Sequence, residues 1–148
     1  MGNVWERSDH LPVSSLDLSG DPDDLPRDPE YLMYLAGRGI GAAAVAVYGV
    51  YGSLHYLREA RGQAPCVAFP YRNLDGSSQA VKFRGTQTKD FACDGAPKDL
   101  WGLHLVKAGE IWITEGEIDA LSLTEIGISN AVSLPNGASI PRDDTGFE

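Results

Sequence analysis

A short apolar run followed at once by acidic residues is the feature that most restricts how this chain can fold. Residues 111–114, Ile-Trp-Ile-Thr, carry no charge, and Glu115-Gly116-Glu117 comes directly after them. A short, continuously apolar run is typical of a strand buried in a parallel sheet. Residues 118–126 then predict a helix that ends at Gly127, and residues 131–134 predict a second buried strand. Strand, helix and strand at this spacing predict a parallel unit whose chemistry lies at the carboxyl ends of its strands.

Three acidic side chains crowd the predicted end of the first strand. Glu115, Glu117 and Asp119 lie within five consecutive residues. Such carboxylates repel one another unless they are solvated, one is protonated, or a hard cation with oxygen ligands neutralises them. The dipole of a helix N-terminus accounts for Glu117 and Asp119. It accounts less well for Glu115, which precedes Gly116 at the strand edge, so Glu115 is the candidate for acidic chemistry.

Two short helices are predicted near the start of the ordered chain. Asp28 is placed to cap a helix that begins at Pro29 and has Gly37 available to end it. Residues 42–48 predict a second helix, which ends at Gly49. A DNA-reading helix-turn-helix is disfavoured because the second helix has no Arg, Lys, Asn or Gln, so a packing role is predicted for the pair.

A β-hairpin is predicted next, with strands at 67–71 and 79–84 on either side of an Asp-Gly turn. Alternation along the second strand places its apolar residues on one face and Lys82 and Arg84 on the other. Lys89 adds a third positive charge a few residues later. The hypothesis is an exposed cationic strand face that meets phosphates, and the alternative is an ordinary strand with solvated bases.

Charge is divided unevenly along the chain. The formal net charge is −6 over residues 1–30, +4 over residues 31–109 and −7 over residues 110–148. A basic middle beside an acidic end suits a site that attracts polyphosphate and holds divalent cations, although chance clustering on solvated faces gives the same totals. Residues 1–28 are acidic and rich in proline, which predicts a linker or tail.

Length and composition exclude several classes of protein. A chain of 148 residues fits one domain, and it has no run as long as a membrane span and no recognisable secretion signal, which predicts a cytoplasmic protein. Cys66 and Cys93 are too few for a four-cysteine zinc ribbon, and both are predicted to be inert, small apolar residues. His10, His55 and His104 show no metal-ligand spacing. A structural zinc site is therefore excluded.

Several motifs occur together in one order. Glu115-Gly116-Glu117-Ile118-Asp119 follows the first apolar run and Asn136-Gly137 follows the second. The upstream motifs are Arg38-Gly39-Ile40, Gly49-Val50, Phe69-Pro70-Tyr71, Asp75-Gly76, Lys82-Phe83-Arg84, Lys89-Asp90-Phe91 and the run from Leu100 to Leu105. In this order and spacing, over roughly residues 30–140, the sequence resembles a Toprim domain and, more narrowly, the primase half of primase-helicases from T-odd bacteriophages. Agreement over several motifs is more specific than Glu-Gly-Glu alone.

The resemblance implies a fold and an activity. The fold class is α/β: residues 29–109 form a basic α+β N-terminal subdomain with a hairpin, and residues 110–148 form the first strand-helix-strand of a Toprim parallel sheet. The implied activity is that of a DNA primase, which makes short RNA primers on single-stranded DNA by Mg²⁺-dependent nucleotidyl transfer from nucleoside triphosphates. A phage-encoded protein of this kind works in the host cytoplasm.

The resemblance also implies roles for individual residues. Glu115 would be the acidic centre, as a general base or as a carboxylate that holds Mg²⁺. Lys82, Arg84 and Lys89 would meet nucleotide phosphates or the template backbone, and Asn136-Gly137 would form a loop near the metal. Bases that face acids across a groove suit phosphoryl transfer, which depends on positioning and charge neutralisation.

The sequence also departs from the family pattern. A Toprim centre continues to a third strand that ends in Asp-x-Asp, whereas Asp143 and Asp144 are adjacent and follow Pro141. The family's zinc ribbon and helicase phosphate loop are not recognised in the sequence either. We therefore expect a fragment or truncation of a longer protein, with a helicase domain in the parent. An open sheet edge is expected along the second or third Toprim strand.

Three interpretations remain at this point. The chain is part of a primase, or it is a non-catalytic remnant that binds nucleotides or single-stranded DNA, because a carboxylate cluster without the Asp-x-Asp pair should hold Mg²⁺ weakly. Another Toprim protein, such as a nuclease or topoisomerase, is disfavoured because the match from Lys82 to Lys89 lies outside the shared Toprim motif.

Overall fold

The computed structural model describes residues 29–137, which begin with two short helices. Helix α1, Pro29–Ala36, turns Tyr31 and Leu35 inward, and each is at most 1% exposed. Helix α2, Ala42–Tyr48, ends where Gly49 takes a left-handed conformation with φ of 67°. Both predicted helices and the packing role of the second are confirmed, since three of the seven residues of α2 are buried. Asp28 lies outside the described residues.

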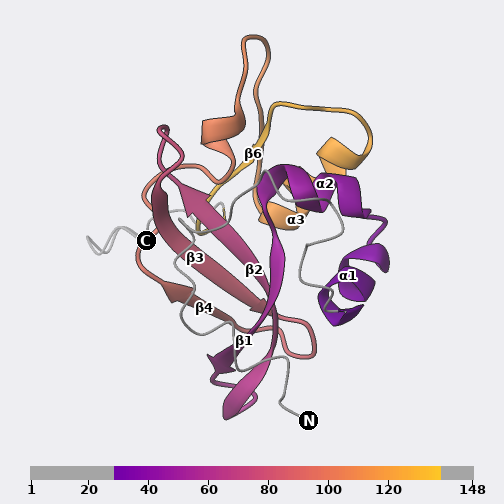
Figure 1. Cartoon of the computed structure of the whole chain (residues 1–148), viewed down its shortest axis with the longest axis vertical. Helices are drawn as coiled ribbons and strands as arrows, with labels where there is room; N and C mark the ends of the chain where they lie inside the picture. Colours follow the sequence, from indigo (N-terminus) through magenta and orange to yellow (C-terminus); the bar gives the residue numbers. More distant parts are fainter. Residues whose placement is uncertain (1–28, 138–148) are drawn as a thin grey trace, which may run out of the picture.

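Four strands form an antiparallel sheet in the order β1-β2-β3-β4. Their bounds are β1 Tyr51–Leu57, β2 Gly62–Arg72, β3 Ser78–Gly85 and β4 Phe91–Asp94. The predicted hairpin is confirmed as β2 and β3, and its turn contains Gly76 with φ of 84°. Figure 1 shows the long, twisted sheet with α1 and α2 beside it.

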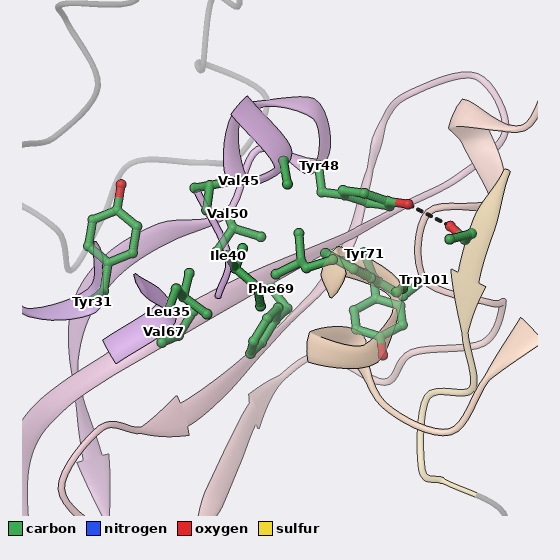
Figure 2. Packing of buried hydrophobic residues seen from close by; sticks show 14 of the residues in the cluster. Tyr31, Leu35, Ile40, Val45, Tyr48, Val50, Val67, Phe69, Tyr71 and Trp101 are labelled. Carbon is green, nitrogen blue, oxygen red and sulfur yellow. Dashed lines mark hydrogen bonds between the residues drawn. The ribbon is translucent and has the colours of Figure 1, made fainter. Parts of the chain in front are cut away.

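The two faces of this sheet bury different groups of residues. Alternation along β2 directs Val67, Phe69 and Tyr71 to the face that packs against α1 and α2, and Figure 2 shows these side chains together with those of the helices. The opposite face holds a smaller cluster that includes Val81 and Phe83. The predicted alternation of β3 is confirmed, and it places Lys82 and Arg84 on the face that carries the helices.

The predicted strand-helix-strand unit is present. Strand β5, Trp112–Thr114, is followed by helix α3, Glu117–Glu125, and strand β6, Ala131–Ser133. The two strands are parallel, with Thr114 opposite Ser133. Together with the antiparallel sheet, this pair confirms the predicted mixed α/β fold.

Trp101 connects the parallel pair to the antiparallel sheet. Its backbone N–H donates to the carbonyl of Ser133 at 2.9 Å, and its indole N–H donates to the carbonyl of Pro70 at 2.9 Å. Trp101 is 1% exposed and its ring stacks on Tyr48 with 4.4 Å between centroids. It precedes a 3₁₀ turn at Leu103–Leu105, and Leu105 packs against the same core. The predicted anchoring role of Trp101 and Leu105 is confirmed.

The prediction that the first Toprim strand is buried is wrong. Ile111, Trp112 and Ile113 are 49%, 47% and 61% exposed. Within residues 29–137, β6 is the one strand paired with β5, so the other edge of β5 is open. By contrast, β6 is fully buried because Trp101 bridges to Ser133 on its other side. Among the described residues, the open edge of this unit therefore lies along its first strand and not along its second.

The two cysteines are both free, but they differ in exposure. Cys66 is buried in the smaller cluster, whereas Cys93 is exposed on β4. The prediction of a small apolar role therefore holds for Cys66 and is wrong for Cys93, because β4 is an edge strand with one side open to solvent. In the part of the chain that the structure describes, no helix has the length and apolar character needed to cross a membrane.

Candidate functional site

An open pocket of about 550 Å³ lies where the antiparallel sheet meets the start of α3. Its walls come from Arg38, which lies two residues beyond α1, from strands β2, β3 and β4, from the turn after β5 and from the loop after β6. The charged and polar side chains that line it are Arg38, Lys82, Arg84, Cys93, Glu115, Glu117, Asp119 and Asn136. The pocket thus collects residues from six separate segments of the sequence.

The acidic side of the pocket is built by the junction of β5 and α3. Glu115 follows the last residue of β5 and is exposed, and Gly116 takes an extended conformation as the N-cap of α3. Glu117 and Asp119 occupy the first turn of the helix. Glu117 is only 4% exposed, whereas Asp119 is exposed. A carboxylate at this end of a helix is stabilised by the dipole, but a buried carboxylate needs specific partners as well.

Glu117 obtains those partners from two strands. The ammonium of Lys82 lies 2.9 Å from Oε1 of Glu117, and the hydroxyl of Tyr71 donates to the same oxygen at 2.5 Å. Lys82 also donates to the carbonyl of Pro135 at 3.0 Å. Burial, reinforced by the Glu117 carboxylate, raises the pKa of Tyr71, so the phenol remains a donor. The three side chains join β2 and β3 to the start of α3.

The expected exposed cationic face on β3 is therefore wrong for Lys82. Its side chain is 13% exposed, and its ammonium forms an ion pair with the carboxylate of Glu117. The reason is that Lys82 projects from the same face as Ala80, which belongs to the main core cluster, and α3 covers this part of the face. Arg84, two residues further along β3, is half-buried and lines the pocket.

Aromatic rings and a second arginine surround Arg84. Its Nε donates to the hydroxyl of Tyr34 at 2.8 Å, and its guanidinium lies 4.9 Å from the ring centroid of Phe91. Arg38 donates to the same Tyr34 hydroxyl at 2.8 Å and lies over the Tyr34 ring at 4.6 Å. Phe91 is 47% exposed and also lies 5.0 Å from the Lys82 ammonium. These distances fall within the range of cation–π contacts.

The pocket consequently contains charged groups of both signs. Lys82 and Glu117 neutralise each other in its wall. Two arginines, Arg38 and Arg84, and two further carboxylates, Glu115 and Asp119, also line the pocket. Among residues 29–137, no carboxylate forms an ion pair with either arginine. This arrangement can hold an anionic group next to a pair of carboxylates.

The remaining predicted site residues separate into two groups. Asn136 and Gly137 line the pocket, and a Cβ added to Gly137 would lie 3.8 Å from the backbone oxygen of Glu115. Lys89 lies outside the lining residues, in the loop between β3 and β4, where its backbone N–H donates to Glu59 at 3.3 Å. The structure thus brings Lys82, Arg84, Glu115, Asn136 and Gly137 together and leaves Lys89 apart.

The acidic residues supply part of what a magnesium ion needs. Mg²⁺ binds oxygen ligands, commonly one or two carboxylates together with water and substrate phosphates. Glu115 and Asp119 fit this chemistry, because both are exposed at the pocket, whereas Glu117 is engaged by Lys82 and Tyr71. Within residues 29–137, no group of three or more Asp, Glu, His or Cys side chains is arranged to hold a metal. Asp143 and Asp144 lie outside the described residues.

Tyr34, Arg38 and Phe91 were not assigned a role from the sequence. Tyr34 and Arg38 are four residues apart, which is the spacing of neighbours on one helix face, so their contact had a detectable signal. No sequence signal predicted the contact between Tyr34 and Arg84, because these residues are 50 positions apart.

Comparisons with known proteins agree with the resemblance seen in the sequence. No protein-family model matches the chain. The Twinkle homolog protein of Arabidopsis thaliana, chloroplastic/mitochondrial, is 34% identical over 91 residues, which cover 56% of this chain and 13% of the relative.

Solved structures give the same result. The primase fragment of the bacteriophage T7 primase-helicase protein is 29% identical, with a TM-score of 0.57 over 69% of this chain and 41% of its own. A T7 primase domain in a complex with the lagging-strand DNA polymerase is 30% identical, with a TM-score of 0.58 over 70% of this chain and 46% of its own. The DnaG catalytic core shares the fold, with a TM-score of 0.55 at 17% identity.

The chain therefore spans less than half of the T7 chains that it matches. By sequence and by fold, it is similar to part of the primase domain of T7-type primase-helicases.

Proposed function

We propose that this chain is part of a DNA primase that makes short RNA primers on single-stranded DNA. The observation that carries the proposal is the pocket itself, which brings Arg84 of β3 together with Glu115 at the carboxyl end of β5. The similarity to T7 primase domains supports it. The substrates are nucleoside triphosphates and a DNA template, and a helicase domain in the parent protein is the expected partner. We place the protein in the cytoplasm, which is that of the host if a phage encodes it.

The basic and the acidic residues of the pocket have separate tasks in nucleotidyl transfer. Arg38 and Arg84 hold the phosphates of the incoming nucleotide or of the template strand, because guanidinium groups pair well with phosphate oxygens. Glu115 lines the same pocket and would accept the proton of the attacking hydroxyl, or would hold Mg²⁺ together with Asp119. When bound, Mg²⁺ neutralises the charge that develops on the phosphates. Asn136 and Gly137 also line the pocket, and Lys82 joins β3 to the start of α3 through Glu117.

A primer-synthesis assay tests this proposal. In a protein that carries this segment within a complete primase domain, Glu115→Gln should lower Mg²⁺-dependent primer synthesis by about 100-fold or more, the usual effect of removing a general base or metal-holding carboxylate. Binding of single-stranded DNA should stay within about twofold, since Glu115 holds no DNA phosphate in this scheme. Glu110→Gln is the matched control, because Glu110 is an exposed acid outside the pocket. Normal priming by Glu115→Gln would refute its role.

A non-catalytic, nucleotide- or DNA-binding module is the second candidate. It is favoured by one observation, namely that the described residues hold no three-ligand acidic cluster for a metal. The 148-residue chain alone distinguishes the two, since this candidate predicts binding of single-stranded DNA or triphosphate without synthesis. Template-directed synthesis by the chain alone would exclude it, and lack of both binding and synthesis would count against both candidates.

A further inference from the structure

Two arginines of the pocket share one hydrogen-bond acceptor. Nη2 of Arg38 and Nε of Arg84 each lie 2.8 Å from the hydroxyl oxygen of Tyr34, although Arg38 follows α1 and Arg84 belongs to β3. Because both nitrogens touch the same oxygen, the two guanidinium groups are immediate neighbours. Two like charges so close repel one another unless something between them or beside them offsets the charge.

No carboxylate among the described residues forms an ion pair with either arginine. The ion pairs within residues 29–137 join His55 to Asp94 and Lys82 to Glu117, so neither arginine takes part in one. A hydroxyl oxygen has two acceptor positions, and both are used by the two arginines. Each guanidinium spends one of its five N–H groups on Tyr34 and keeps four. Both side chains line the pocket, so the arginine pair presents several donors and two charges to a ligand there.

The ring of Tyr34 restricts the pair further. The Arg38 guanidinium lies over this ring at 4.6 Å, while the Arg84 guanidinium lies over the ring of Phe91 at 4.9 Å. Each planar group is therefore oriented by a ring face and by a hydrogen bond to Tyr34. Orientation matters because a planar guanidinium recognises phosphate oxygens through two parallel N–H groups. A pair oriented before binding loses less conformational freedom when the ligand arrives.

From this geometry we infer that Tyr34 is a positioning residue, which holds Arg38 and Arg84 as a paired clamp for one phosphate group. The inference rests on the proposed function, because the phosphate belongs to a nucleoside triphosphate or to the backbone of single-stranded DNA. Tyr34 acts through the arginines and is not itself among the residues that line the pocket.

Binding measurements on the 148-residue chain test the inference, with oligo(dT) and GTP as separate probes to distinguish the two sources of phosphate. Tyr34→Phe keeps the ring and removes the shared acceptor, so the affinity for at least one probe should fall about five- to tenfold, as expected for one lost hydrogen bond. Tyr56→Phe is the matched control, because Tyr56 is a 58% exposed tyrosine of β1, and it should leave both affinities unchanged.

A thermodynamic cycle separates positioning from general damage to the fold. In the background of Arg38→Gln and Arg84→Gln together, adding Tyr34→Phe should change the affinity less than about twofold, because residues that act as a unit are not additive. For oligo(dT), Tyr34→Phe should also reduce the slope of log affinity against log salt by about 0.7, the loss of one phosphate contact on a single strand. Arg84→Lys keeps the charge but loses the Nε that donates to Tyr34, so it should weaken binding by a factor similar to that of Tyr34→Phe. It is the alternative test variant if Tyr34→Phe does not fold.

The outcomes differ for the inference and for the proposed function. Tight binding that is unaffected by Tyr34→Phe, or an equal loss in both backgrounds, would overturn the positioning role and leave the proposed function standing. Failure of the unaltered chain to bind either probe would overturn the proposed function and this inference with it.

Discussion

Lys82 and Glu117 form a buried ion pair, with 2.9 Å between Nζ and Oε1, and their side chains are 13% and 5% exposed. The pair joins the centre of β3 to the first residue of α3, and Tyr71 and the carbonyl of Pro135 complete its hydrogen bonds. The family resemblance assigns Lys82 to phosphate binding, but in the structure its ammonium is already paired with Glu117 in the wall of the pocket. Its removal should therefore affect stability before it affects binding.

Breaking this pair from one side should destabilise the protein strongly. Glu117→Gln leaves a buried ammonium without its counter-charge, which typically costs about 3–5 kcal/mol. Combining Glu117→Gln with Lys82→Met should cost less than the sum of the single changes, because neither charge is then left alone. Urea unfolding measures each free energy. The exposed Glu110→Gln serves as the control and should stay within about 0.5 kcal/mol of the original chain.

Three glycine-to-alanine changes should separate backbone strain from steric overlap. Gly62→Ala meets open space at an ordinary φ and should be nearly neutral. Gly39→Ala also meets open space but has φ of 77°, so it should cost about 1–2 kcal/mol. Gly102→Ala adds to a φ of 82° a Cβ only 2.7 Å from Cε1 of Tyr48, so it should cost the most. Equal midpoints of thermal unfolding for Gly39→Ala and Gly102→Ala would show that the overlap relaxes without cost.

The Tyr48 hydroxyl should stabilise the contact between α2 and the parallel unit. It donates to the carbonyl of Ala131 at 2.7 Å, a bond drawn in Figure 2, and lies 3.0 Å from Oγ1 of Thr124. Tyr48→Phe leaves that buried carbonyl without its donor and should cost about 1–3 kcal/mol of unfolding free energy. Tyr56→Phe, at an exposed position, should cost almost nothing. Similar losses in the two variants would argue against a role for the hydroxyl.

Cys66 should make the protein less stable at alkaline pH. Burial raises the pKa of its thiol from 9.0 to about 11, so the unfolded chain releases this proton at a lower pH than the folded chain. The free energy of unfolding should therefore be unaffected by this thiol below pH 9 and should fall as the pH rises towards 11, with a loss of about 1 kcal/mol at pH 10. Cys66→Ala should show a flatter profile of unfolding free energy between pH 8 and pH 10, whatever its stability at pH 8. Parallel profiles would exclude the thiol as the cause.

Arg84 and Lys89 should differ in their effect on ligand binding. Arg84 lines the pocket, whereas Lys89 lies in the loop beyond the end of β3. Arg84→Gln should weaken binding of oligo(dT) or triphosphate about tenfold, as expected for a charge-assisted contact, and Lys89→Gln should weaken it less than about threefold. Fluorescence anisotropy at two salt concentrations measures both. A larger loss for Lys89→Gln would instead support its assignment to the template path.

Local features were predictable because they depend on neighbouring residues. Gly49 ends α2 with a left-handed conformation, the Asp-Gly turn closes the hairpin, and alternation separates Lys82 from Phe83. The order of the apolar runs also predicts β5, α3 and β6. Burial of Ile113 could not be judged in the same way, since an apolar strand is buried only if another element covers it.

The sequence by itself determined the two N-terminal helices, the hairpin, the strand-helix-strand unit, the strand-end position of Glu115 and the resemblance to primases, since each follows from local pattern or motif spacing. The edge strands β1 and β4 were not predicted. Tertiary structure alone decided which charges are paired and which remain available. Glu117 is 35 residues from Lys82 in sequence and Arg84 is 50 from Tyr34, yet both pairs are in contact. Such contacts depend on how the two sheets and α1 pack together, and the free energy of burying a charge depends on the partner that this packing supplies.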